Sequence, residues 1–165
     1  MKILVTYLTV TGNTKKVADA IFGVIEEEKT IQPISEVNDI EGYDLTFVGS
    51  PMHGFGLNNT VKEFIEKKGK GKNIALFVTH ASPEGDEQLQ GWLDSCKEAA
   101  AGANLVGFFD CQGEMSKEIA DAMAKMDDPE IAAWGKMRDE TLGQPDVTRL
   151  ERARVFAREA MSKMS

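Results

Sequence analysis

Hydroxyl and amide side chains cluster near the start of the chain, where their spacing could bind an anion. The cluster consists of Thr9, Val10, Thr11, Gly12, Asn13 and Thr14. An apolar run, Lys2–Leu8, precedes it, and a segment with helical apolar spacing, Asn13–Glu28, follows it. A strand that turns into a helix in this way gathers backbone N–H groups and hydroxyls at the positive end of a helix dipole. The segment therefore predicts a phosphate site.

The absence of Lys and Arg from this loop limits the phosphate that it could hold. Lys15 and Lys16 come only after the turn. The loop lacks both Gly-x-Gly-x-x-Gly, the dinucleotide pattern, and Gly-x-x-x-x-Gly-Lys-Ser/Thr, the nucleoside-triphosphate pattern. Helix-end electrostatics contribute about 0.3–1 kcal/mol at an exposed site and up to ~2 kcal/mol at a partly buried one. Neutral donors therefore suit a single phosphomonoester, and Gly12 permits positive φ or a close backbone approach.

The pattern Thr-x-Thr-Gly-Asn-Thr at Thr9–Thr14 resembles the FMN-phosphate loop of the flavodoxins and matches it at every defined position. An ordinary turn with a Thr or Asn helix cap is the alternative interpretation. The resemblance implies FMN as the cofactor. It also implies that the flavin ring lies over the loops that follow the third and fourth strands.

Two loops rich in Gly, Pro and Ser stand where the resemblance places the flavin ring. The first offers Ser50, Pro51, Met52, His53, Gly54, Phe55 and Gly56, and the second offers Thr79, His80, Ala81, Ser82 and Asp86. In many flavodoxins a Trp and a Tyr from these loops sandwich the ring, whereas here His53 stands near the Trp position and Gly85 near the Tyr position. The resemblance thus implies a ring that is open on one face or covered by another segment. Gly54 matches the family glycine whose peptide flips to bond flavin N5.

The only two histidines, His53 and His80, both fall in these loops. Because an unperturbed histidine has a pKa near ~6.5, either could couple a proton to flavin reduction. A surface or stacking role is the alternative. Acidic residues also crowd this edge, at Glu84, Asp86, Glu87, Asp110 and Glu114. Their charge would lower the flavin potential and attract a basic redox partner, unless they form only a solvated loop surface.

The elements that must position these loops alternate between apolar runs and helical patterns. Strands are expected at Lys2–Leu8, Thr30–Ile34, Asp44–Ser50, Asn73–Thr79 and Leu105–Gln112, and helices at Asn13–Glu28, Asn59–Lys68, Glu87–Gly102 and Thr148–Ser162. This alternation predicts an α/β fold with a parallel sheet covered by helices on both faces, and Pro33 makes the second strand an edge. The resemblance implies a doubly wound, five-stranded sheet in the order 2-1-3-4-5, with the ligand at the carboxyl ends of the strands.

Residues 113–146 depart from the short flavodoxins, which pass almost directly from the last strand to the last helix. Ser116–Met126 and Pro129–Leu142 have helical patterns. The segment carries Met115, Met123, Met126, Trp134 and Met137. Because methionines form adaptable apolar surfaces, we hypothesise a cap beside the flavin or a partner-docking surface. Two helices that use Met only as core filler are the alternative.

Length, charge and cysteine content narrow the function classes. One domain is expected over residues 1–165, and the net charge of −8 argues against nucleic acid. No apolar stretch approaches the ~20 residues of a membrane span, and no secretory cleavage pattern follows the first strand. Cys96 and Cys111 lack metal-type spacing and favour packing roles. We therefore expect a cytoplasmic, reduced protein without a metal site.

These features predict a non-catalytic FMN protein that shuttles low-potential electrons between redox enzymes. The alternative is an FMN-dependent reductase, or a dedicated flavin subunit of a reductase system, which the altered ring loops and the Met-rich insertion favour. Ser50 and Pro51 stand where a phosphorelay receiver needs its phosphoacceptor Asp. The first loop has no Cys, so the Cys-x₅-Arg loop of a low-molecular-weight phosphatase is absent.

Overall fold

A parallel sheet in the order β2-β1-β3-β5-β6 forms the centre of the molecule. In the computed structural model, which describes residues 1–165, the strands are β1 (Lys2–Tyr7), β2 (Glu28–Pro33), β3 (Leu45–His53), β5 (Asn73–His80) and β6 (Asn104–Gln112). A further strand, β4 (Gly56–Leu57), pairs antiparallel with the end of β3. The expected α/β fold and strand order are confirmed, while the two-residue β4 was not predicted.

The strand boundaries follow from burial and pairing. β1, β3 and β5 are buried almost throughout, as expected for the centre of a sheet covered on both faces. β2 lies at the edge, where Pro33 pairs with Tyr7 at the last position of the ladder. β3 runs three residues beyond the predicted end at Ser50, because Pro51 pairs with Thr79 and the next two residues pair with β4.

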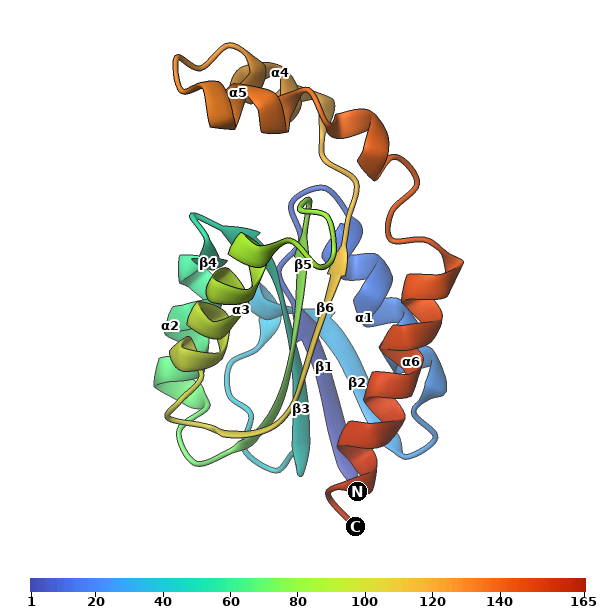
Figure 1. Cartoon of the computed structure of the whole chain (residues 1–165). Helices are drawn as coiled ribbons and strands as arrows, with labels where there is room; N and C mark the ends of the chain where they lie inside the picture. Colours follow the sequence, from blue (N-terminus) through green and yellow to red (C-terminus); the bar gives the residue numbers. More distant parts are fainter.

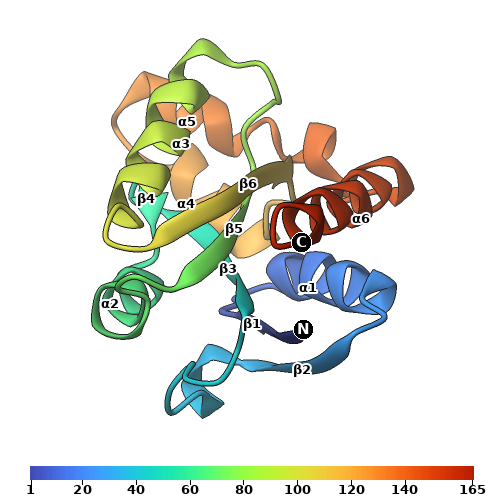
Figure 2. The ribbon, with the colours of Figure 1, turned by 90° about the horizontal axis from the view of Figure 1, so that it is seen from below.

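Helices cover the two faces of the sheet in pairs (Figures 1 and 2). α1 (Asn13–Val24) and α6 (Val147–Ser162) lie on one face, and α2 (Asn59–Lys68) and α3 (Glu87–Ala99) lie on the other. α1 ends at Val24, four residues before the predicted Glu28. Ile25 is already extended, and the edge strand β2 begins at Glu28.

The two cysteines belong to the separate apolar clusters on the two faces of the sheet. Burial raises the pKa of the Cys96 thiol to about 11 and that of Cys111 to about 12. Both thiols are therefore protonated, unreactive packing groups, as the sequence indicated.

The insertion between β6 and α6 forms two short helices, α4 (Lys117–Ala124) and α5 (Pro129–Gly135), followed by a 3₁₀ turn at Arg138–Thr141. Figure 1 shows them above the carboxyl ends of the strands. The helical stretch predicted near Pro129–Leu142 is interrupted, because α5 ends at Gly135 and helical geometry resumes only in the 3₁₀ turn at Arg138–Thr141. A Cβ on Gly135 would lie 2.5 Å from the Ala120 carbonyl oxygen, so α5 crosses α4 at a point that only glycine fits. No helix in the structure is both long enough and apolar enough to span a membrane.

Candidate functional site

The loop between β1 and α1 presents unpaired backbone donors at the start of a helix. Gly12 is the N-cap of α1 at φ +97°, a left-handed conformation that favours glycine, and its N–H donates to Thr9 Oγ1 at 3.0 Å. The other α-helices are capped by side chains, from Asn58, Asp86, Ser116, Asp128 and Asp146. α1 has no side-chain cap and no acidic residue in its first turn. Its first N–H groups are therefore free to bind an external anion.

Some side chains of this loop have hydrogen-bond partners within the chain, and others do not. The Thr11 side chain is exposed and makes no hydrogen bond within the chain. Asn13 Nδ2 donates to the Glu114 carbonyl at 2.9 Å and keeps a second N–H. The Thr14 hydroxyl is buried 2.8 Å from that of Thr79, so it joins α1 to β5. Either hydroxyl of this pair can be the donor, so the expected role of Thr14 at the phosphate stays a prediction, and Thr11 carries the hydroxyl of the loop that has no partner within the chain.

A cavity of about 650 Å³ opens beside this loop at the carboxyl ends of the strands. Most predicted site residues line it, namely Thr9, Val10, Thr11, Asn13, Thr14, Pro51, Met52, His53, Gly54, Phe55, Thr79, His80, Ala81, Ser82 and Asp86. Gly12, Ser50 and Gly56 lie outside the lining. The Ser50 hydroxyl is buried and bonds within the β3–β4 hairpin, donating to the Pro51 carbonyl at 2.8 Å and accepting from Asn58 N–H at 3.2 Å. Gly56 pairs with His53 in the hairpin, and Gly12 is the helix cap described above.

The insertion supplies much of the remaining wall. All five of its predicted residues, Met115, Met123, Met126, Trp134 and Met137, line the cavity. The structure therefore supports the cap interpretation rather than core filler. Glu114 was expected at this edge as an acidic residue, and Gly113, Ser116, Ile119 and Ile131 belong to the expected cap segment. The lining residues outside those expectations are Asn58, Pro83 and Trp92.

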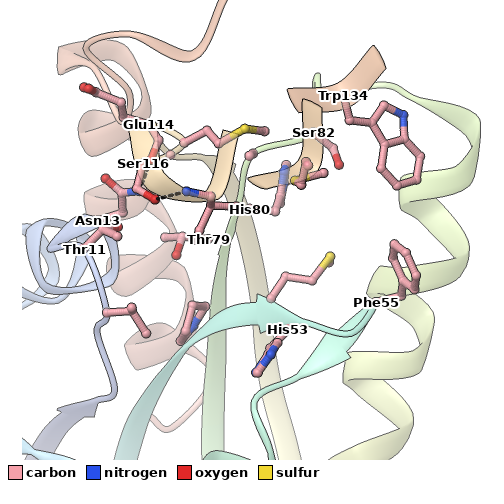
Figure 3. Close-up of a pocket in the computed structure, with 18 of the residues that line it drawn as sticks. Thr11, Asn13, His53, Phe55, Thr79, His80, Ser82, Glu114, Ser116 and Trp134 are labelled. Atoms are coloured by element: carbon pink, nitrogen blue, oxygen red, sulfur yellow. Dashed lines mark hydrogen bonds between the residues drawn. The ribbon is translucent and has the colours of Figure 1, made fainter. Parts of the chain in front are cut away.

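Three aromatic rings from separate elements meet at one end of the cavity. Phe55 stacks on Trp92 of α3 at 4.7 Å between ring centroids, and Trp134 of α5 meets the two rings edge-on at 6.1 and 5.8 Å. Phe55 has φ +65° and is the only non-glycine residue with positive φ. Figure 3 shows Phe55 and Trp134 facing each other at the end opposite Thr11 and Asn13. The tryptophans thus come from α3 and the cap, and not from the two ring-facing loops.

The two histidines have different surroundings. The His80 side chain is 1% exposed, with Nε2 2.8 Å from Asp110 Oδ2 and with Nδ1 buried and unpartnered. Neither ring nitrogen of His80 is therefore open to the cavity. The His53 side chain is exposed and lines the cavity, and the hypothesis that a histidine couples a proton to flavin reduction stays a prediction for both residues.

Several of the acidic residues at this edge are paired with cations. Glu84 binds Arg149 at 3.0 Å and Arg152 at 2.7 Å, and Glu114 lies 3.3 Å from Arg138. Burial alone would raise the pKa of Glu84, but the hydrogen bonds to Arg152 and the Gln112 backbone outweigh it and lower this pKa below the usual range. These arginines offset part of the negative charge that the sequence suggested for this edge of the sheet.

The two ends of the insertion, residues 113–115 and 143–144, form a neck that hydrogen bonds hold beside the phosphate loop. The Glu114 N–H donates to the Gln144 carbonyl at 2.8 Å, and its carboxylate accepts from Gly143 N–H at 3.1 Å. Arg138 Nε donates to the Met115 carbonyl at 2.9 Å. Because Asn13 bonds to the same segment, the neck and the phosphate loop form one connected structure.

Comparisons with known proteins agree with this geometry. Residues 4–157 match a family model described as a flavodoxin domain. The flavodoxin-like domain-containing protein BilS of Clostridioides difficile (strain CD3) is 30% identical over 175 residues, which cover 100% of this chain and 99% of that protein. Oxidised Flavodoxin 2 from Bacillus cereus has a TM-score of 0.63 at 20% identity over 99% of both chains. A flavoprotein from Lactobacillus acidophilus NCFM, solved in complex with FMN, has a TM-score of 0.55 at 20% identity, over 75% of this chain and 99% of its own.

Proposed function

We propose, because this chain belongs to the flavodoxin family, that it is an FMN protein that carries low-potential electrons between redox enzymes. The observation that carries the proposal is the uncapped start of α1, which opens into the cavity at the strand ends. Bound FMN supplies one- and two-electron transfer, which side chains alone do not provide.

The residues of the loop fit the cofactor phosphate. Backbone N–H groups of the first turn of α1 and the Thr11 hydroxyl supply neutral donors around one point. Asn13 is held by the Glu114 carbonyl and keeps one N–H to donate. Such donors favour a phosphomonoester at a helix start without a metal or a lysine.

The loops after β3 and β5 and the cap control the surroundings of the flavin ring. Gly54, at φ +59°, lies in the β3–β4 turn and can change its peptide orientation with little strain. Met123 and Met126 of the cap line the same cavity and add apolar surface beside the ring site. Apolar surface lowers the local dielectric and so strengthens the electrostatic effect of nearby groups on the ring.

An FMN-dependent reductase is the second candidate. The observation that favours it is the apolar, cap-lined end of the cavity, where Trp134 lies away from the phosphate loop and contacts Trp92. A carrier that meets only other proteins does not need such an apolar cavity.

Anaerobic mixing distinguishes the two functions. The carrier function predicts that the photoreduced protein passes electrons rapidly to a protein acceptor such as cytochrome c, and that NADH or NADPH alone does not reduce the oxidised protein. Direct reduction by NAD(P)H, followed by turnover with a small organic acceptor, would instead identify a reductase.

We also propose that the redox partner has a basic docking surface. The chain has a net charge of −8, and Asp86 in the cavity lining and its neighbour Glu87 have no cationic partner. Charge complementarity of this kind accelerates encounter more than it raises affinity.

A further inference from the structure

One acidic residue of the insertion lies beside the start of α1, where the phosphate is expected. The Glu114 carbonyl accepts a hydrogen bond from Asn13 Nδ2 at 2.9 Å, and Glu114 lines the cavity. Figure 3 shows Glu114 next to Asn13, at the end of the cavity where Thr11 lies. The first turn of α1 contains no acidic residue, and no Lys or Arg lines the cavity. A carboxylate at this position would repel a phosphate unless another group offset its charge.

Arg138 is the cation that contacts this carboxylate. Its Nη2 atom lies 3.3 Å from Glu114 Oε1, while Glu114 Oε2 accepts a hydrogen bond from the Gly143 N–H at 3.1 Å. The side chains of Arg138 and Glu114 are 28% and 36% exposed. Water therefore screens the pair only in part, and the guanidinium offsets much of the carboxylate charge.

Backbone hydrogen bonds fix Arg138 against the neck. Its Nε donates to the Met115 carbonyl at 2.9 Å. Its own carbonyl accepts from the Thr141 hydroxyl at 2.7 Å, and the oxygen of that buried hydroxyl accepts from the Met115 N–H at 2.9 Å. The planar guanidinium binds a carboxylate and a carbonyl together, which the single ammonium of a lysine reproduces poorly. The 3₁₀ turn after α5 thus places one cation next to Glu114.

The position of Arg138 separates its effect from direct binding of the phosphate. Arg138 does not line the cavity, whereas Glu114 does. Arg138 acts on a bound phosphate by offsetting the Glu114 charge and by holding the peptide whose carbonyl orients Asn13. A flavin without a phosphate gains nothing from either effect.

We propose that Arg138 is a positioning residue of the phosphate site, which acts through Glu114 and sets the preference for a phosphorylated over an unphosphorylated flavin. This inference rests on the FMN site proposed above. It gives the insertion a second role beside lining the cavity, because the 3₁₀ turn supplies the positive charge that the phosphate loop lacks. An arginine that only joined this turn to the neck would affect both forms of the flavin alike.

Titration of the apoprotein with FMN and with riboflavin measures this preference as the ratio of the two dissociation constants. Arg138→Met removes the guanidinium and keeps an apolar side chain. We expect the preference for FMN to fall about tenfold through weaker FMN binding, while the riboflavin affinity changes by less than about twofold. Arg138→Lys keeps the charge without the planar group, so it should cause a smaller loss. Circular dichroism checks that each variant is folded.

Arg154→Met on α6 is the matched control. Arg154 is also partly buried and lies 3.1 Å from a carboxylate, that of Glu151, but it is outside the cavity lining. It should leave the preference for FMN unchanged.

Glu114→Gln tests whether Arg138 acts through this carboxylate. Glutamine keeps the shape of the side chain and can accept from the Gly143 N–H, but it carries no charge. Glu114→Gln alone should keep the preference for FMN. Combined with Arg138→Met, it should recover most of the loss, since no carboxylate then remains to be offset. A double variant as poor as Arg138→Met would overturn the inference.

The outcomes separate this inference from the proposed function. If the wild type prefers FMN and Arg138→Met keeps that preference, or weakens both flavins equally, the role of Arg138 is wrong and the FMN site stands. If the folded wild type binds FMN no more tightly than riboflavin, the phosphate site fails and the inference fails with it.

Discussion

Thr11 is the side chain of the phosphate loop that is most available to a ligand. Its neighbours in the motif already have partners, since Thr14 bonds to Thr79 and Asn13 bonds to the Glu114 carbonyl. The sequence motif does not separate these roles, because it shows which residue types are present and not which hydroxyl a neighbouring strand occupies. The pairing with Thr79 depends on the contact of α1 with β5, which only the fold reveals.

Thr11→Val removes this free hydroxyl at nearly constant side-chain size. A hydrogen bond to a charged group contributes about 1.5–3 kcal/mol, so we expect the Kd for FMN to rise about ten- to a hundredfold. Titration of the apoprotein with FMN, followed by flavin fluorescence, measures the change. Thr60→Val on α2 is the control, because Thr60 is exposed and lies outside the cavity. Equal FMN affinity in Thr11→Val and the wild type would show that the Thr11 hydroxyl does not bind FMN.

Glu84 links the second ring-facing loop to α6 and should make stability depend on pH. Its pKa is lowered in the folded state by Arg152, so its contribution is present above about pH 4.5, the ordinary value, and is lost as pH falls through the lowered value. Glu84→Gln should reduce the free energy of unfolding by roughly 1 kcal/mol at pH 7, since the pair is partly solvated.

Urea unfolding at pH 7 and at steps from pH 5 to 3 measures this effect. The difference between Glu84→Gln and the wild type should shrink through the acidic steps. Glu151→Gln, on the exposed surface of α6, is the control and should cause a smaller loss. A loss from Glu84→Gln that is the same at every pH would show that its charge is not what stabilises the loop.

At the scale of elements, the sequence predicted the sheet and the long helices better than the cap. Apolar runs predicted the five main strands, and their order came from the family resemblance. The end of α5 at Gly135 was missed, because it depends on how closely α4 crosses it. Trp92 was missed as a lining residue, because it lies beside the buried stripe of α3 formed by Leu89, Leu93 and Cys96, and periodicity alone does not show what it faces.

The contact between the cap neck and the phosphate loop can be tested at Gly113. A Cβ at this position would lie 2.6 Å from Asn13 Nδ2 and 3.0 Å from Asn13 Cβ. Gly113→Ala should therefore displace Asn13, cost about 1–3 kcal/mol of stability and weaken FMN binding. Thermal unfolding and FMN titration measure the two effects.

Gly91→Ala on α3 is the matched control for Gly113→Ala, because its Cβ would meet nothing within 4 Å. It should raise stability by up to about 1 kcal/mol through helix propensity and leave FMN affinity unchanged. If Gly113→Ala behaves like Gly91→Ala, the neck and the phosphate loop are not coupled as described.

At the scale of the whole molecule, the net charge of −8 governs encounters with partners. Oxidation of the reduced protein by the basic acceptor cytochrome c should slow about tenfold or more between low salt and roughly 0.2 M salt, because added ions screen the attraction. Ferricyanide, which is anionic, is the control and should react faster as salt rises. A cytochrome c rate that does not change with salt would argue against electrostatic docking.

The central claim is that the start of α1 binds the phosphate of FMN. Titration of the apoprotein with FMN and with riboflavin tests it most directly, because the two ligands differ only in the phosphate. Helix-end electrostatics of up to ~2 kcal/mol and at least one charge-assisted hydrogen bond predict that FMN binds at least about a hundredfold more tightly. Equal affinity for FMN and riboflavin would contradict the account.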